Sequence, residues 1–145
     1  MHSTNYHDTF IAVAPDCPVA QGTAPPESAK PSAALLAYRL IQSRPYQLSS
    51  DDVLFSVYAE RLQLPPEQRA TARAAFFSKP QACLRASDLG KRYGWGIHCN
   101  AEGKVALVGA ETALYQSLVS GQLPSQAARP VAVKYAMRSR RATST

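Results

Sequence analysis

The sequence predicts an α+β fold, with a small, largely antiparallel sheet of about four strands and helices packed on one face. Three observations lead to this prediction. Strand-like segments lie near both ends of the chain, helix-like segments are grouped between them, and a hairpin follows the grouped helices. Such grouping is typical of α+β proteins, whereas strict alternation is typical of a parallel sheet. The 145 residues suit one globular domain, which we expect to span 1–145.

The N-terminal part of the chain predicts a strand, a loop and a helix. Segment 9–14 combines β-branched and aromatic residues, so it predicts the first strand. Segment 15–31 is rich in proline and predicts a loop. Ser32 is placed to cap a helix that runs to about residue 44, where the following proline ends it.

Two further helices are predicted before residue 78. Ser49 or Ser50 caps the first, and the two aspartates after it suit the positive end of the helix dipole better than a catalytic pair. A third helix spans Pro66 to Phe77, because proline is tolerated at a first helical position. The apolar stripe that we expect the second helix to bury comprises Val53, Leu54, Val57, Tyr58 and Leu62.

The C-terminal half predicts a short helical turn, a hairpin, a helix and a strand. Ser87 or Asp88 caps the turn, and segments 95–99 and 104–108 flank a four-residue connection that ends in glycine. The helix spans 111–120, with Gly121 as its C-cap, and 122–130 is a loop. The residues of this helix that we expect to point inward are Leu114, Tyr115, Leu118 and Val119. Apolar alternation over 131–138 predicts the last strand, and 138–145 is a basic, flexible tail.

Alternation along the strands also predicts which residues share a face of the sheet. We expect one face to carry Trp95, Ile97 and Cys99 together with Val131, Val133, Tyr135 and Met137. The other face is then expected to carry Gly96, His98, Lys134 and Arg138.

Composition restricts the classes of function. The net charge of +6 favours anionic partners, and the apolar runs are too short to span a membrane. The N-terminus has no secretory pattern and the number of cysteines is odd, so we expect a cytoplasmic protein with reduced thiols. No His or Cys pair has metal-ligand spacing, and His98 and Cys99 point to opposite faces of a strand. We therefore expect neither a metal nor a cofactor.

The segment Cys83-Leu-Arg-Ala-Ser-Asp-Leu-Gly-Lys-Arg-Tyr-Gly-Trp-Gly-Ile-His98 is the candidate site. Its glycines allow backbone N–H groups to approach an anion, and its cations add charge. The ligand-binding residues that we expect are Arg85, Lys91, Arg92, Tyr93, Trp95, His98 and Arg138. The structural alternative is that Gly94 and Gly96 permit a tight turn while Trp95 packs in the core.

Three classes of function stay open. The first is a non-enzymatic module that binds an anionic, phosphate-bearing ligand. The second is an enzyme acting on a phosphorylated or carboxylated small molecule through His98 or Cys83. The third is a nucleic-acid-binding or protein-adaptor domain that uses the C-terminal cations, which are Arg129, Lys134, Arg138, Arg140 and Arg141.

Several segments together resemble a family of small, mostly microbial proteins catalogued as a domain of unknown function. The matching segments are 4–11, 16–18, 45–46, 50–60, 76–79, 83–98, 103–107 and 136–142. They cover nearly the whole chain apart from 19–34 and 120–130. The resemblance implies one intact domain in a soluble intracellular protein, and it implies no activity, ligand or catalytic residue.

Overall fold

A computed structural model describes residues 2–120 and 131–138 and confirms the α+β class. Within these residues the elements, in chain order, are β1 (Thr9–Ala12), α1 (Ala33–Ser43), α2 (Ser50–Arg61), α3 (Pro66–Phe76), the 3-10 helix η1 (Leu84–Ala86), α4 (Asp88–Lys91), β2 (Trp95–Cys99), β3 (Val105–Gly109), α5 (Ala113–Ser120) and β4 (Ala132–Tyr135). Gly121, the loop 122–130 and the tail after Arg138 lie outside the described residues.

The four strands form one mixed, mostly antiparallel sheet in the order β3-β2-β1-β4. The predicted hairpin is confirmed, because β2 and β3 pair antiparallel with Cys99 opposite Val105. β1 lies between the hairpin and β4, antiparallel to β2 and parallel to β4. The N-terminal strand is therefore one of the two inner strands of the sheet, and the C-terminal strand is one of its edges.

The predicted assignment of residues to faces of the sheet is wrong for β4. Ile11 pairs with both Ile97 and Lys134, so Lys134 is on the face that carries Ile97. Phe10 pairs with His98 and Val133, which places Val133 on the face of His98. Alternation separates the two sets of side chains within a strand, but the register against β1 decides which set joins which face.

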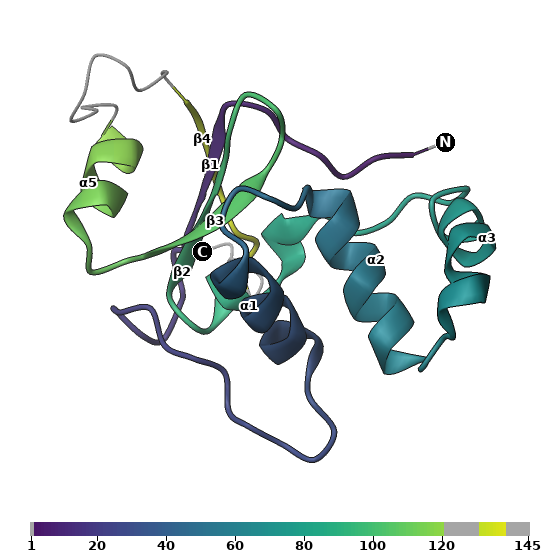
Figure 1. Ribbon diagram of the computed structural model, residues 1–145. Coiled ribbons are helices and arrows are strands. Elements are labelled where there is room, and N and C mark those ends of the chain that lie inside the picture. The colour runs from purple at the N-terminus through teal and green to yellow at the C-terminus, as the bar shows by residue number, and fades with distance from the viewer. Residues whose placement is uncertain (1, 121–130, 139–145) are drawn as a thin grey trace, which may run out of the picture.

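Helices cover both faces of the sheet (Figure 1). On one face, α1, α2 and α4 bury Ile11, Ile97 and Cys99 in the larger core. On the opposite face, Leu118 of α5 packs on Phe10 and Ala12 in a second core. The predicted one-sided arrangement therefore holds for α1, α2 and α4, and α5 is the exception. Burial of the large Phe10 ring, which is 0% exposed, requires this second layer.

Serine caps begin α1, α2 and α4, as the sequence predicts. Ser32 Oγ accepts the N–H of Leu35 at the start of α1. Ser49 Oγ accepts the N–H of Asp52, whose carboxylate accepts the N–H of Ser49 in return, and the two bonds form a capping box. Ser87 caps the single turn of α4. Each cap satisfies N–H groups that would otherwise lack a partner at the helix start, and contributes about 1 kcal/mol.

The predicted buried stripe of α2 is only partly correct. Val53 and Val57 are buried, but Tyr58 is 40% exposed and Leu62 is 55% exposed. Phe55 and Ala59 are buried instead, in a small cluster with Phe77 that lies beside α3. The helix is apolar on two sides, so its sequence does not show which side meets the protein. On α5, Leu114 is likewise exposed and not inward-pointing.

None of the helices within 2–120 and 131–138 has both the length and the apolar character to cross a membrane.

Candidate functional site

The proline-rich loop packs on the centre of the predicted site. The indole N–H of Trp95 donates to the Thr23 carbonyl oxygen at 2.9 Å, and the Thr23 N–H donates to the Tyr93 carbonyl oxygen at 2.8 Å. A side chain at Gly22 would meet the indole ring at 2.8 Å, so the loop backbone lies directly on it. The protein itself therefore occupies one surface of Trp95 and the backbone of Tyr93.

Two glycines in this segment are required by close backbone packing. Gly94 has a φ of 75°, and a Cβ there would lie 2.3 Å from the Gln21 carbonyl oxygen. A Cβ at Gly96 would lie 2.4 Å from the Phe10 ring. These contacts favour the structural explanation of both glycines. Gly94 lets the backbone turn while the proline-rich loop packs against it, and Gly96 leaves room for the Phe10 ring against the strand.

Arg85 connects η1 to the end of β4. Its Nε–H donates to the Tyr135 carbonyl oxygen at 2.8 Å, and its own carbonyl oxygen accepts the N–H of Met137 at 2.8 Å. Next to this pair of bonds, a Cβ at Gly90 of α4 would lie 2.8 Å from Ala136 Cβ. The contacts bring together η1, α4 and the residues that follow β4.

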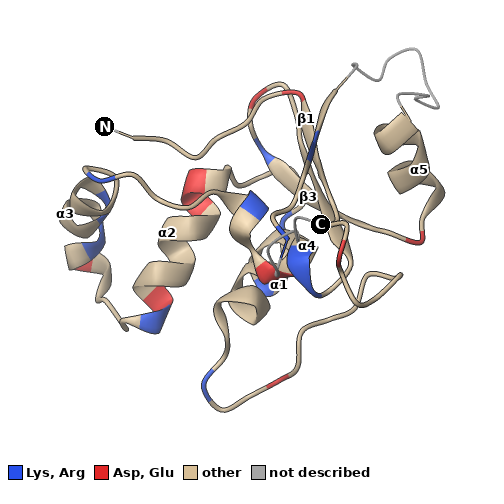
Figure 2. Cartoon of the chain, turned by 180° about the vertical axis from the view of Figure 1, so that it is seen from behind, with Lys and Arg blue, Asp and Glu red and all other residues tan. Residues whose placement is uncertain are grey.

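We call Arg85, Lys91, Arg92 and Arg138 the basic cluster. They come from these three neighbouring segments, and Arg92 and Arg138 are exposed while the other two are half-buried. The three ion pairs among the described residues involve Arg39, Arg69 and Arg73, and none involves the basic cluster. Basic and acidic residues lie close together on α2 and α3 (Figure 2), and Asp88 lies in α4 with Lys91.

His98 does not join the basic cluster. It lies on the α5 face of the sheet, opposite the face of Trp95, where its Nδ1 is 2.8 Å from the hydroxyl oxygen of Tyr46. The two rings meet edge to face with centroids 5.6 Å apart. Burial lowers the pKa of His98 below its ordinary value, and the charge of Asp8 opposes this effect. Burial also raises the pKa of Tyr46.

The backbone around His98 is unusual at two positions. Tyr46 has a φ of 60° and Asp8 a φ of 45°, and such values are uncommon for residues other than glycine. Residues held in this region are enriched at functional sites. Sequence reasoning identified His98 but missed both neighbours, because Tyr46 is 52 residues away and nothing in a sequence marks a positive φ at tyrosine.

Cys83 lies beside Tyr6 and Arg85. The hydroxyl oxygen of Tyr6 is 3.3 Å from Cys83 Sγ. This contact is the main reason that the pKa of Tyr6 is raised, while the nearby Arg85 lowers it. Cys99 is fully buried, and burial raises its pKa to about 12, so its thiol stays protonated at neutral pH. Among the described residues, no three His, Cys, Asp or Glu side chains gather to hold a metal ion.

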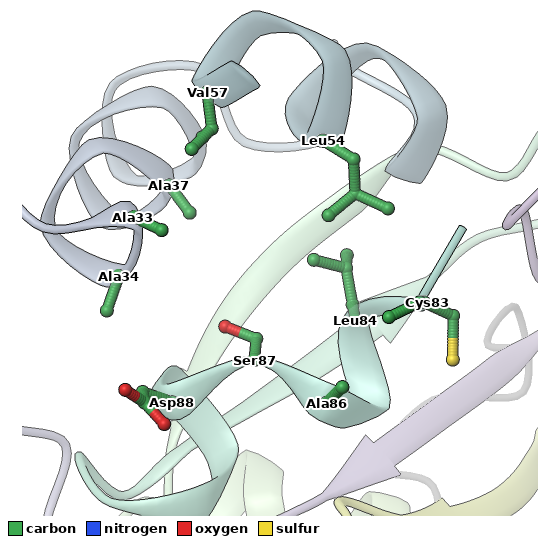
Figure 3. Close-up of a pocket in the computed structure, with 11 residues that line it drawn as sticks. Ala33, Ala34, Ala37, Leu54, Val57, Cys83, Leu84, Ala86, Ser87 and Asp88 are labelled. Carbon is green, nitrogen blue, oxygen red and sulfur yellow. The ribbon is translucent and has the colours of Figure 1, made fainter. Parts of the chain in front are cut away.

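A cavity of about 250 Å³ lies between α1, α2 and the η1–α4 segment (Figure 3). Its lining residues are Ala33, Ala34, Ala37, Leu54, Val57, Ala82, Cys83, Leu84, Ala86, Ser87 and Asp88. Leu54 and Leu84 point toward each other across it, the Ser87 hydroxyl points into it, and the Cys83 sulfur points away. Sequence reasoning missed the cavity, because its lining residues, five of which are alanines, come from separate segments of the chain.

The fold and these sites define a small α+β domain with a central four-stranded mixed sheet covered by helices on both faces. Residues 1–142 match the family described as "Family of unknown function (DUF6157)", and the chain belongs to this family. The resemblance noted from the sequence is thereby confirmed. No similar chain was found among the curated proteins or among the solved structures.

Proposed function

We propose that the protein is a non-enzymatic module that binds an anionic, phosphate-bearing ligand at the basic cluster. One observation carries the proposal: the two hydrogen bonds between Arg85 and the end of β4 gather cations from segments about 50 residues apart in the chain. The partner is an anionic small molecule or a nucleic acid, since phosphate is common to both.

The electrostatics of the cluster support an anionic ligand. Gathering like charges raises the free energy of the folded chain, and a bound anion lowers it again. The Nε–H bond to Tyr135 orients the Arg85 guanidinium, which has further N–H donors in a fork that suits phosphate oxygens. Arg92 and Arg138 are exposed, so a ligand can reach them without opening the core.

A cytoplasmic location belongs to the same proposal. Cys17, Cys83 and Cys99 are all free thiols, as is typical of proteins kept in a reducing compartment.

Thermal unfolding with pyrophosphate, ATP or a short single-stranded oligonucleotide, at low and moderate salt, tests the proposal. A ligand that binds the native state raises Tm by mass action. The double variant Arg92→Ala/Arg138→Ala should lose the rise in Tm, whereas the control Arg61→Ala/Lys79→Ala removes two exposed cations elsewhere and should keep it. A steep fall in oligonucleotide binding with salt would indicate nucleic acid as the partner. An equal response of both double variants would refute a site at the basic cluster.

Acid–base catalysis at His98 is the second candidate, and the 2.8 Å contact with Tyr46 favours it. A half-buried histidine held neutral by its surroundings is able to accept a proton near neutral pH, and a tyrosine hydroxyl is able to donate one. For this candidate, a substrate identified by screening should be turned over by the wild type with a rate that depends on one ionisation. His98→Gln should abolish that turnover, and Arg92→Ala/Arg138→Ala should spare the chemical step.

A further inference from the structure

We propose that the cavity between α1, α2 and the η1–α4 segment is a second binding site, which takes a small apolar amine. This inference is independent of the proposed anion site, because the two sites share no residue and select opposite charges. It follows from the size of the cavity, the chemistry of its walls and the position of Asp88.

The size of the cavity sets the size of the ligand. An apolar cavity of about 150 Å³ is sufficient for benzene, and drug-sized ligands use pockets of roughly 300 Å³ or more. At about 250 Å³, this cavity suits one ring or a short aliphatic chain with a small polar group. A nucleotide is too large for it.

The walls are apolar over most of their extent. Ala33, Ala34 and Ala37 of α1 form one side, Leu54 and Val57 of α2 form another, and Leu84 closes the space from η1 (Figure 3). Alanine on α1 is what leaves the space open, because a larger side chain at these positions would fill it. A hydrocarbon body gains free energy by leaving water for such walls.

The polar groups of the cavity select the charge of the ligand. Ser87 and Asp88 both line the cavity, where the Ser87 hydroxyl points inward and the Asp88 carboxylate lies toward the side of Ala34. Ser87 Oγ already accepts the N–H of Leu89, which leaves its O–H to bond elsewhere. None of the three ion pairs among the described residues includes Asp88. An ammonium group is attracted by this carboxylate, and a ligand carboxylate or phosphate is repelled.

Binding of benzylamine tests the site, with benzyl alcohol and benzoate as probes of matched shape and different charge. Each is titrated into the full chain, and Kd is measured by calorimetry or from the rise in Tm. We expect benzylamine to bind the wild type, benzyl alcohol to bind about tenfold more weakly, and benzoate to show no binding.

Two variants and one control place the binding in the cavity. Asp88→Asn should weaken the binding of benzylamine about tenfold, so that benzylamine no longer binds more tightly than benzyl alcohol. Ala33→Leu should abolish binding of both by filling the space, and residue 33 is exposed, so the fold should tolerate the change. The control is Glu67→Gln, which also removes an acid from a first helical turn but lies outside the cavity lining, and this variant should bind benzylamine like the wild type.

Three results would each overturn the proposal. They are failure of benzylamine to bind, unchanged binding in Ala33→Leu, and equal binding of all three probes. The proposed anion site is tested separately through Arg92 and Arg138, so none of these results bears on it.

Discussion

His98 Nδ1 and the hydroxyl oxygen of Tyr46 lie 2.8 Å apart, although 52 residues separate them in the chain. Tyr46 reaches this position because the segment between α1 and α2 runs along the β3 edge. The Tyr46 N–H donates to the Val105 carbonyl oxygen, and the Val105 N–H donates to the Leu48 carbonyl oxygen. The same bonds satisfy backbone groups of an edge strand that would otherwise be open to pairing with another chain.

This arrangement predicts that the protein loses stability as the pH falls below about 6.5. Burial lowers the folded-state pKa of His98 below its unfolded value, so the unfolded state binds the proton first. Neutral His98 therefore contributes its full share of the free energy of unfolding when the pH is above the pKa of the unfolded state. That share is lost as the pH falls from the unfolded-state pKa to the lower folded-state pKa. Urea unfolding from pH 5 to 8 measures the loss, and His98→Gln should flatten the curve in that window. An unchanged curve in His98→Gln would assign the pH dependence to other groups.

Gly94→Ala should destabilise the protein by about 2 kcal/mol or more, because strain at a positive φ costs roughly 1–3 kcal/mol for a residue other than glycine. The new Cβ would also lie 2.3 Å from the Gln21 carbonyl oxygen, which is backbone. The matched control is Gly103→Ala, where φ is 78° but the nearest neighbour is the movable His7 ring at 3.0 Å. Chemical denaturation of both should show the larger loss for Gly94→Ala. Equal losses would mean that the loop moves away without cost.

Trp95→Phe should loosen the proline-rich loop while leaving the rest of the fold intact. The change keeps an aromatic ring but removes the indole N–H that donates to the Thr23 carbonyl oxygen. Such a hydrogen bond contributes about 1 kcal/mol. Limited digestion after Glu27 by a Glu-specific protease and amide exchange of Thr23 should both accelerate. Tyr38→Phe, which keeps a ring beside Trp95, is the control and should leave both rates near those of the wild type.

Asp52→Asn should weaken the capping box of α2 and reduce stability by about 1 kcal/mol at neutral pH. Partial burial acts to raise the pKa of this carboxyl, but the Ser49 N–H and the Arg73 guanidinium outweigh it and lower the pKa below 3.8. The unfolded state therefore protonates first on acidification, and the stability from ionised Asp52 is lost as the pH falls through the folded pKa. The acid-unfolding curve of Asp52→Asn should therefore lack the loss of stability that protonation of Asp52 causes in the wild type. A wild-type acid profile in Asp52→Asn would show that the carboxylate contributes no net stability.

Part of the candidate site was visible in the sequence and part was not. Sequence reasoning selected Arg85, Lys91, Arg92 and Arg138 from their charge and from the glycines around them, and the structure places them in neighbouring segments. It grouped His98 and Trp95 with them because they are close in the chain, although strand alternation already predicted that the two side chains lie on opposite faces of the sheet, as they do. It did not indicate Tyr6, Asp8 or Tyr46, whose partners are distant in sequence.

The sequence by itself determined the helix start at Ser32 and the hairpin between Cys99 and Val105. It also narrowed two further helix starts to adjacent residues, Ser49 or Ser50 and Ser87 or Asp88, and the structure has Ser49 and Ser87 as the caps. Caps and turns depend on residues within a few positions of one another, so their chemistry is readable locally. Only the tertiary structure decided that β4 pairs in parallel with β1, which side of α2 is buried, and which segments line the cavity. Those features depend on which distant segments meet. The segments that meet are those for which the free energy gained by burying apolar surface exceeds the entropy lost in closing the long loops between them.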